Sequence, residues 1–377
     1  MTADSAPFLI VAVTGRVLAT SAARGGYPVV VLDCFADRDT TAVAREATVV
    51  AKPGTMHLDR AAVLRRANVL APAAHCAGLI VGSGFERGGT FLAKLAAGRT
   101  LMGNQPGVIA TVKDPRRLFP LLDRLEIPHP EVRLTPPANP AGWLAKRAGG
   151  AGGTHVGEAG EGGKGRGLYF QRFETGRVCS VLFLCDGTRA SVVGFNEQWT
   201  RQVGATRPFV YAGAVGRLEL PEAVEQDVRV RLDGLVSATG LIGLAGLDFL
   251  WRGEEWLALE VNPRPTATLD LYDADYPRGL FHAHLQACAG RLPTEEVPRS
   301  TVRAQVILPA DEPWRLPEGF AFPAWCRDLP QDGHRFQAGE PVCTVQAEAA
   351  DHDTAVSLLR SRRMELQRMM SGVPTRG

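Results

Sequence analysis

The sequence lacks an excess of either charge, and it lacks any long hydrophobic run. Its 42 Lys and Arg residues are balanced by 40 Asp and Glu residues, giving a formal net charge of +2. Proteins that bind nucleic acid usually concentrate basic residues on one face, so we expect no nucleic-acid partner. No apolar stretch approaches the ~18 residues that a membrane-spanning helix requires. The sequence therefore predicts no membrane partner.

A regular cysteine pattern is also absent. The seven cysteines are scattered along the chain without a CxxC pair, and their number is odd. A secreted disulfide framework is disfavoured on both grounds, and a reducing compartment is favoured. The N-terminal stretch MTADSAPFLIVAVTG has no basic segment before its apolar run, so it predicts a first strand and not a signal peptide. We expect a cytoplasmic location.

Two common chemical signatures are missing. The loop after the first predicted strand, VTGRVLA, holds a single glycine and no GxGxxG, although Asp33 follows the second strand. A nicotinamide-binding site is therefore disfavoured. No Ser-His-Asp or Cys-His arrangement is evident, which disfavours catalysis by a protein nucleophile.

An alternation of apolar strands and helices opens the chain. Continuous apolar runs predict strands buried on both faces, and the segments between them predict helices, an order that is typical of a parallel α/β sheet. We expect residues 1–105 to form a doubly wound domain. The predicted strands are 7–13, 28–33, 47–51 and 78–83, and the predicted helices include 17–26 and 59–67.

A glycine-dense loop at residues 149–167 follows a short predicted strand that carries Lys146 near its end. Small residues let backbone N–H groups approach phosphate oxygens closely, and a lysine supplies a compact positive charge. The alternative is a flexible linker. Because the loop lies between two hydrophobic strands with a lysine before it, a phosphate-covering lid is favoured.

The stretch LDFL…LEVNPRP predicts a hairpin over residues 246–262. A three-residue loop at 253–255 would place Asp248 directly opposite Glu260, with Asn262 one step further on the same face. Opposed like charges are destabilising, so they indicate a cation such as Mg²⁺ between them. The alternative is a register shifted by one residue, with one carboxylate facing water. Arg264, between two prolines, is either an anion-binding arginine or a solvated loop residue.

Together these features resemble the ATP-grasp superfamily. The order is Lys113 on a helix, Lys146 before the glycine-rich lid, and then the D…ExN cluster, and the resemblance covers nearly the whole chain. It implies an α/β fold with α+β grasp lobes. An N-terminal doubly wound pre-ATP-grasp domain (1–105) would be followed by an ATP-grasp domain (106–295, lid about 145–175) and a small β-rich C-terminal segment with a helix (296–377).

The resemblance also implies roles for individual residues. Lys113 and Lys146 would contact ATP phosphates under a lid formed by Gly149, Gly150, Gly152 and Gly153. Gln171, Arg172 and Phe173 would lie beside the adenine. Asp248, Glu260 and Asn262 would hold Mg²⁺, with Mn²⁺ as an alternative, and Arg264 would bind the transferred phosphate or an acyl phosphate. Many members carry a glutamate for the ribose two residues after the hinge glycine. Here Arg177 and Val178 follow Gly176, which leaves Glu174 as the candidate.

The activity that this resemblance implies is an ADP-producing ligase that joins a small-molecule carboxylate to an amine through an acyl phosphate. A narrower resemblance rests on GLIVGSGFE, YFQRFETG, FNEQW and PAWCRDLPQDGHRFQAGEPVCTV. It is to a group related to biotin carboxylase, some of whose members are linked to methanopterin- or methanofuran-type cofactor biosynthesis. The alternatives are carboxylation with bicarbonate and a non-catalytic nucleotide-binding module. A homodimer is compatible with the resemblance, and residues 82–86 are expected to line the acceptor pocket.

Overall fold

The N-terminal part of the computed structural model is a four-stranded parallel sheet in the order β3-β2-β1-β4. The structure describes residues 5–87, 89–162, 167–294 and 301–371. Alternate residues of β1, β2 and β4 enter different cores, so these strands are covered on both faces, by α1 and by α3 with α4, whereas the edge strand β3 is partly exposed and contrasts with the prediction of burial on both faces. The elements are β1 (Phe8–Val11), α1 (Arg16–Arg24), β2 (Val29–Asp33), α2 (Arg38–Val43), β3 (Glu46–Val49), α3 (Arg60–Leu70), β4 (Gly78–Val81) and α4 (Gly89–Ala96).

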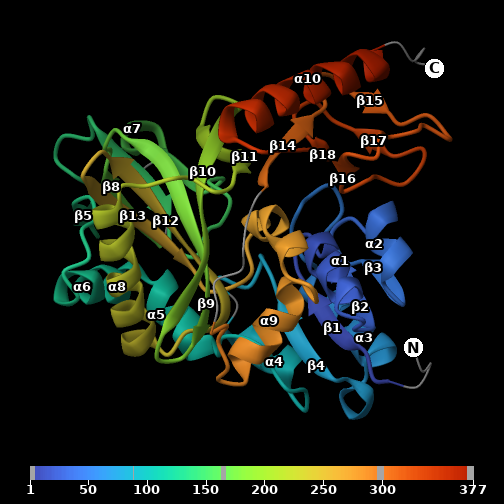
Figure 1. The fold of residues 1–377 in the computed structure, drawn as a ribbon, viewed down its shortest axis with the longest axis horizontal. Helices are drawn as coiled ribbons and strands as arrows, with labels where there is room; N and C mark the ends of the chain where they lie inside the picture. Colours follow the sequence, from blue (N-terminus) through green and yellow to red (C-terminus); the bar gives the residue numbers. More distant parts are fainter. Residues whose placement is uncertain (1–4, 88, 163–166, 295–300, 372–377) are drawn as a thin grey trace.

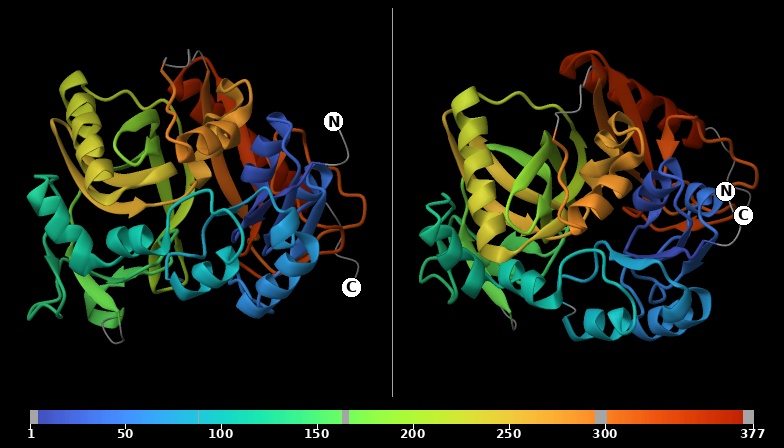
Figure 2. Two further views of the ribbon diagram at one scale, coloured as in Figure 1. Left: turned by 90° about the horizontal axis from the view of Figure 1, so that it is seen from below. Right: turned by 60° about the horizontal axis from the view of Figure 1, so that its bottom comes forward.

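An eight-stranded antiparallel sheet forms the centre of the molecule, in the order β13-β12-β9-β10-β11-β14-β18-β16 (Figures 1 and 2). It joins strands from the middle of the chain to strands from its C-terminal part. The elements from the middle are β9 (Arg177–Asp186), β10 (Ala190–Val203), β11 (Arg207–Val215), α8 (Glu222–Thr239), β12 (Ile242–Arg252), β13 (Glu255–Asn262) and α9 (Gly279–Cys288).

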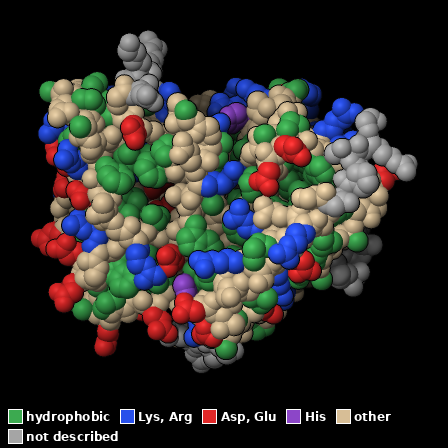
Figure 3. Space-filling model, turned by 90° about the horizontal axis from the view of Figure 1, so that it is seen from above, with side chains coloured by type: hydrophobic (Ala, Val, Ile, Leu, Met, Phe, Trp, Pro, Cys, Tyr) green, Lys and Arg blue, Asp and Glu red, His purple; other side chains and the backbone are tan. Residues whose placement is uncertain are grey.

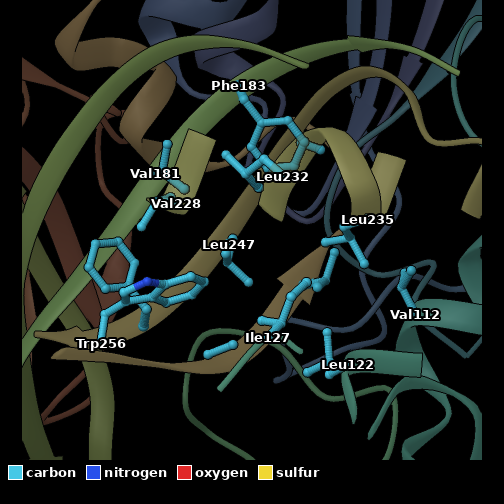
Figure 4. Packing of buried hydrophobic residues seen from close by; sticks show 14 of the residues in the cluster. Val112, Leu122, Ile127, Val181, Phe183, Val228, Leu232, Leu235, Leu247 and Trp256 are labelled. Carbon is cyan, nitrogen blue, oxygen red and sulfur yellow. The ribbon is translucent and has the colours of Figure 1, made fainter. Parts of the chain in front are cut away.

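Helices α8 and α9 pack on opposite faces of this sheet. In β9, Val181 and Phe183 join the core beneath α8, whereas Leu182 and Leu184 join the core that includes α9. Figure 4 shows the first of these cores. Burial on both faces explains why β9 is continuously apolar from Val181 to Cys185. Helix α9 also packs against α1, which attaches the N-terminal sheet to the central one.

A second four-stranded sheet, in the order β5-β8-β6-β7, holds the predicted lid. Its own hydrophobic core is very small and consists of Trp143, Ala145, Ala159 and Phe170. Helices α5 and α6 precede it. The elements are α5 (Pro106–Lys113), α6 (Pro115–Arg124), β5 (Val132–Arg133), β6 (Trp143–Arg147), β7 (Val156–Glu158), α7 (Ala159–Gly162) and β8 (Leu168–Arg172). Residues 163–166 of the predicted lid lie outside the described residues.

Strands β14, β18 and β16 continue the central sheet, whereas β15 and β17 form a separate two-stranded sheet, and helix α10 packs on β14 and β18 (Figure 1). The helix predicted within the C-terminal segment is observed as α10. The predicted C-terminal segment begins at 296, and residues 295–300 and 372–377 lie outside the described part. The remaining strands and helix are β14 (Val302–Pro309), β15 (Trp314–Arg315), β16 (Cys326–Arg327), β17 (Arg335–Phe336), β18 (Pro341–Ala349) and α10 (His352–Ser371), and short 3₁₀ helices lie at Ala73–His75, Ala267–Leu271 and Asp273–Asp275.

The surface agrees with the balanced composition, because acidic and basic side chains are interspersed over the face shown in Figure 3. All seven cysteines are free thiols. None of the helices in the described part of the chain is long and apolar enough to cross a membrane.

Candidate functional site

The hairpin of β12 and β13 places Asp248 directly opposite Glu260, as predicted. The predicted loop, however, is wrong. Arg252 pairs with Glu255, so the loop has two residues and not three. A two-residue loop alone would pair Asp248 with residue 259 and turn Glu260 to the other face. A β-bulge corrects this, because the pairing shifts between Asp248 and Phe249 and leaves Leu259 as the extra residue.

Lys113, at the C-terminal end of α5, lies against this pair of strands. Its Nζ donates a hydrogen bond to Asn262 Oδ1 over 3.0 Å and forms a very short ion pair with Glu260. The amide of Asn262 in turn donates to Asp248 Oδ2 over 3.0 Å, and Gln198 donates to Asp248 Oδ1 over 3.1 Å. The structure thus joins the predicted phosphate-binding lysine to the three predicted metal ligands in one network.

The two opposed carboxylates have different electrostatic environments. Burial, reinforced by the charge of Glu260, raises the pKa of Asp248 to about 6. Burial also acts to raise the pKa of Glu260, but Lys113 and then His155 outweigh it and hold that pKa at about 2. Ionising both groups together is therefore unfavourable unless more positive charge arrives.

The donor set is suitable for a hard cation. Asp248, Glu260 and Asn262 offer carboxylate and amide oxygens on one face, the ligand type that Mg²⁺ prefers. Within the described ranges, no group of three or more His, Cys, Asp or Glu side chains could hold a metal by itself. Mg²⁺ commonly binds with one or two carboxylates and completes its shell with water and substrate phosphates. These residues fit that kind of site.

A pocket lies between this cluster and the glycine-rich loop. Its wall combines apolar side chains from α5, α6 and β8 with the charged groups of Lys113 and Glu260. Leu259, the bulge residue, also reaches it. The lining residues are Val112, Lys113, Pro115, Leu118, Phe119, Arg147, Gly149, Gly150, His155, Tyr169, Leu259 and Glu260.

The glycine-rich loop is folded down onto its neighbours. Gly153 has a φ of +71°, and a side chain there would overlap the carbonyl oxygen of Phe209 on β11. The Tyr211 N–H donates to Gly152 O over 3.1 Å, and Arg87 Nε donates to Ala148 O over 2.6 Å. The loop therefore contacts both β11 and the N-terminal domain. Of the four predicted lid glycines, Gly149 and Gly150 line the pocket, whereas Gly152 and Gly153 lie against β11.

Lys146 is buried on β6, where its Nζ makes a very short hydrogen bond to Gln171 Oε1 on β8. Burial is the main cause of its lowered pKa, and the nearby charges of Glu260 and Asp248 oppose that shift. Lys146 is therefore within electrostatic range of the carboxylate pair. Among the described residues, Lys146 is not one of those that line the pocket.

The residues predicted to bind adenine and ribose, Gln171, Arg172, Phe173 and Glu174, are not among the described residues that line this pocket. Arg172 lies over the Trp143 ring, with 5.7 Å between its guanidinium carbon and the ring centroid. The Phe173 side chain is 45% exposed. Glu174 Oε2 accepts a hydrogen bond from Arg252 over 3.2 Å. Within the described ranges, Gln171 is the member of this group that contacts another predicted site residue, Lys146.

Arg264 forms a buried ion pair that the sequence did not predict. Its Nε donates to Glu86 Oε1 over 2.6 Å, and both side chains are largely buried. Burial alone would raise the pKa of Glu86, but Arg264 and then Lys113 outweigh it and lower that pKa. Glu86 lies in the 82–86 segment expected to line the acceptor pocket, so that segment lies beside the charge cluster.

Sequence reasoning missed two further residues of the cluster. The ring of His155 is 8% exposed, and its Nε2 lies 3.9 Å from Glu260 Oε2. Burial is the main cause of a lowered His155 pKa, and the charge of Glu260 opposes that shift. Gln198 orients Asp248. The position of His155 within the glycine-rich loop, two residues after Gly153, was a signal for the first, and the FNEQW stretch contains the second.

Comparison with known proteins identifies the domain that carries this site. The sequence model of the ATP-grasp domain family matches residues 112–268. No curated protein sequence matches the chain significantly. Several solved structures share its fold over nearly the whole length.

Three of these structures represent the range. The biotin carboxylase domain of 2-oxoglutarate carboxylase from Hydrogenobacter thermophilus, in complex with MgADP and bicarbonate, has a TM-score of 0.73 and 12% identity, covering 94% of this chain and 89% of that one. The L-amino acid ligase from Bacillus licheniformis has a TM-score of 0.69 and 14% identity, covering 97% of this chain and 98% of that one. The N5-carboxyaminoimidazole ribonucleotide synthetase from Thermus thermophilus has a TM-score of 0.67 and 19% identity, covering 97% of this chain and 99% of that one.

These comparisons confirm the predicted resemblance to the ATP-grasp superfamily and the predicted α/β fold class. At such identities the solved structures show a shared fold. The substrates named for those proteins are not assigned to this chain by the shared fold.

Proposed function

We propose that this chain, whose residues 112–268 are an ATP-grasp domain, is an ATP- and Mg²⁺-dependent ligase that joins a carboxylate to an amine. The observation that carries the proposal is the network of Lys113, Asn262, Glu260 and Asp248 beside a pocket covered by glycines. Positive charge, hard oxygen ligands and a covering loop are what phosphate transfer requires from a protein.

The proposed reaction has two steps. A carboxylate oxygen attacks the γ-phosphorus of ATP, a P–O bond forms, and the bond to ADP breaks. The amine then attacks the acyl carbon of the resulting acyl phosphate, phosphate leaves with the C–O bond electrons, and the nitrogen loses a proton. No protein nucleophile is needed in either step, in agreement with the residues present.

Each residue of the network has a task in this scheme. Lys113 and Lys146 neutralise phosphate charge, and their burial strengthens that effect. Asp248, Glu260 and Asn262 would hold Mg²⁺, which supplies charge neutralisation at the transferring phosphate. Arg264, fixed between prolines and oriented by Glu86, binds the transferred phosphoryl group or the acyl phosphate. The glycine-rich loop excludes water from the pocket.

Carboxylation with bicarbonate is the second candidate. It is favoured by one comparison, since the biotin carboxylase domain with bicarbonate has a TM-score of 0.73, above that of the amino acid ligase. Bicarbonate would then take the place of the organic carboxylate and form carboxyphosphate.

ADP release tests these alternatives. We expect release that depends on both an organic carboxylate and an amine. Release that requires bicarbonate would support carboxylation. ATP binding without ADP release in any mixture would contradict catalysis and support a nucleotide-binding module.

The finer substrate assignment extends this proposal. The narrower resemblance points to biosynthesis of a one-carbon cofactor of the methanopterin or methanofuran type, so the substrates tried in the ADP-release assay should include glutamate and pterin or furan precursors.

We expect the reaction in the cytoplasm, which supplies ATP and a reducing environment. A homodimer is one assembly to be tested, and sedimentation measures the oligomeric state directly.

A further inference from the structure

We propose that a hollow at the edge of the N-terminal sheet binds the anionic end of one substrate, a small carboxylate- or phosphate-bearing molecule with an apolar portion. The hollow is separate from the pocket under the glycine-rich loop. This inference rests on the proposed ligase function for its role as a substrate site, but its ligand-binding property stands on the structure alone.

The hollow has a volume of about 360 Å³, within the ~300–1,000 Å³ range of small-molecule sites. Val13 follows β1, Leu58 lies between β3 and α3, and Gly84 follows β4. All three strands are parallel, so their carboxyl ends meet at this edge. Ligands of open α/β sheets bind outside the carboxyl ends of the strands.

Three groups that can donate hydrogen bonds to an anion line the hollow: Lys52, His57 and Arg60. Their backbone is ordered by its own hydrogen bonds. The Lys52 N–H donates to His57 O over 2.8 Å, and the Thr55 N–H donates to Lys52 O over 3.1 Å. Lys52 and His57 therefore stand at the two ends of a closed turn, which fixes where their side chains start.

The floor of the hollow is apolar. Leu58 and Phe91 are buried, and Val13 is partly buried beside them. Arg60 lies over the Phe91 ring, with 5.3 Å between its guanidinium carbon and the ring centroid. The ring restricts the guanidinium without using its hydrogen-bond donors, which leaves them for an anion.

The acid next to these cations in the sequence is already engaged. Asp59 accepts hydrogen bonds from Ala61 N over 2.9 Å and Ala62 N over 3.0 Å, and so caps the start of α3. Its carboxylate does not appear among the groups that line the hollow in the described structure. The charge presented to a ligand is therefore positive.

A hydrogen-bond chain connects the hollow to the reaction centre. Gly84, which lines the hollow, donates its N–H to Glu86 Oε2 over 2.8 Å. The other oxygen of Glu86 accepts from Arg264. A substrate in contact with Gly84 would therefore lie next to the residue that binds Glu86, the partner that orients Arg264. An anionic tail held by Lys52 and Arg60 would position the rest of the molecule toward that pair.

Direct binding to the full-length protein tests the inference. The probes are 3-phenylpropionate, phenyl phosphate and the neutral 3-phenylpropanamide, titrated by calorimetry and by amide chemical shifts. We expect both anions to bind at least about 10-fold more tightly than the amide, with shifts confined to residues around the hollow. The Lys52→Gln/Arg60→Gln double variant should abolish this preference, whereas Arg66→Gln, an exposed position on the same helix, should keep it.

The outcomes separate this inference from the proposed function. Tighter binding of one anion identifies a carboxylate or a phosphate as the natural group. Equal binding of the amide, or an unchanged double variant that melts like the wild type, would overturn the inference. In the ADP-release assay, the double variant should raise the KM of one organic substrate about 10-fold and leave the KM of ATP unchanged. A wild type that releases no ADP contradicts the ligase proposal, while the probe titrations still decide the hollow.

Discussion

Glu86 and Arg264 form an ion pair with 2.6 Å between Oε1 and Nε, although 178 residues separate them in the chain. The pair joins the end of β4 in the N-terminal sheet to the segment after β13. It places the arginine next to the Lys113 network, since the charges of both Arg264 and Lys113 act on Glu86. The two sheets therefore meet at the site, and each contributes to it.

We expect Glu86→Gln to lower the free energy of unfolding by about 1–3 kcal/mol, because the largely buried Arg264 loses its charged partner. The turnover number should fall as Arg264 loses its orientation, with little change in the KM for ATP. Urea unfolding and ADP-release kinetics measure the two effects. Glu46→Gln, at an exposed position of β3, is the control, and equal stability of the two variants would contradict the role of the pair.

Glu260→Gln should abolish ADP formation, with a loss of at least about 100-fold, because it removes a metal ligand and the charged partner of Lys113. Circular dichroism and thermal melting should show a folded protein. Glu255→Gln, at the exposed start of the same strand, should retain activity. An active Glu260→Gln enzyme would remove this residue from the metal site.

Lys146→Ala should raise the KM for ATP at least about 10-fold, since a buried phosphate contact is lost. It also leaves Gln171 Oε1 without its donor, so stability is measured in parallel. Lys94→Ala, an exposed lysine on α4, controls for the loss of positive charge. Unchanged ATP kinetics would show that Lys146 does not contact the nucleotide.

ATP with Mg²⁺ should slow amide hydrogen exchange in the β6–β8 sheet at least about 10-fold. The described part of this sheet has a core of four residues, so its local stability is low and binding should increase it strongly. Mass spectrometry of peptides from 143–162 and 167–172 measures the change. Peptides from β9 and β12, buried in the central sheet, serve as the internal control, and an equal response in both would argue against a lid.

Asp37→Asn should stabilise the protein more at pH 8 than at pH 5. Burial, reinforced by the charge of Asp328, raises the Asp37 pKa to about 9 in the folded state, against about 3.9 in an unfolded chain. Because the folded pKa is the higher one, the contribution to stability is greatest below about pH 4. It declines as the pH rises toward 9, by up to about 1.4 kcal/mol per pH unit. Asparagine does not titrate, so the variant avoids this decline.

Thermal melts at both pH values measure the difference between the variant and the wild type. Asp353→Asn, a fully exposed position at the start of α10, separates the effect of burial from the loss of a charge. A difference that does not grow with pH would show that Asp37 ionises in the folded protein as it does in water.

The sequence by itself determined the central strands of the N-terminal sheet and the face of β13 that carries the candidate site. Continuous apolar runs predicted β1, β2 and β4 because strands covered on both faces bury nearly every residue. The alternation in LEVN placed Glu260 and Asn262 together because successive side chains of a strand point to opposite faces. These rules depend on local backbone geometry, which short stretches of sequence fix.

Only the tertiary structure decided how the site is joined. The hairpin has a shorter loop than predicted, and the bulge at Leu259 restores the pairing of Asp248 with Glu260. Bulges depend on how a strand meets its surroundings, and here the extra residue reaches a pocket formed by α5 and α6. The contacts of Lys113 with Glu260 and of Glu86 with Arg264 span 147 and 178 residues. Such pairs follow from the packing of whole elements, which no local pattern encodes.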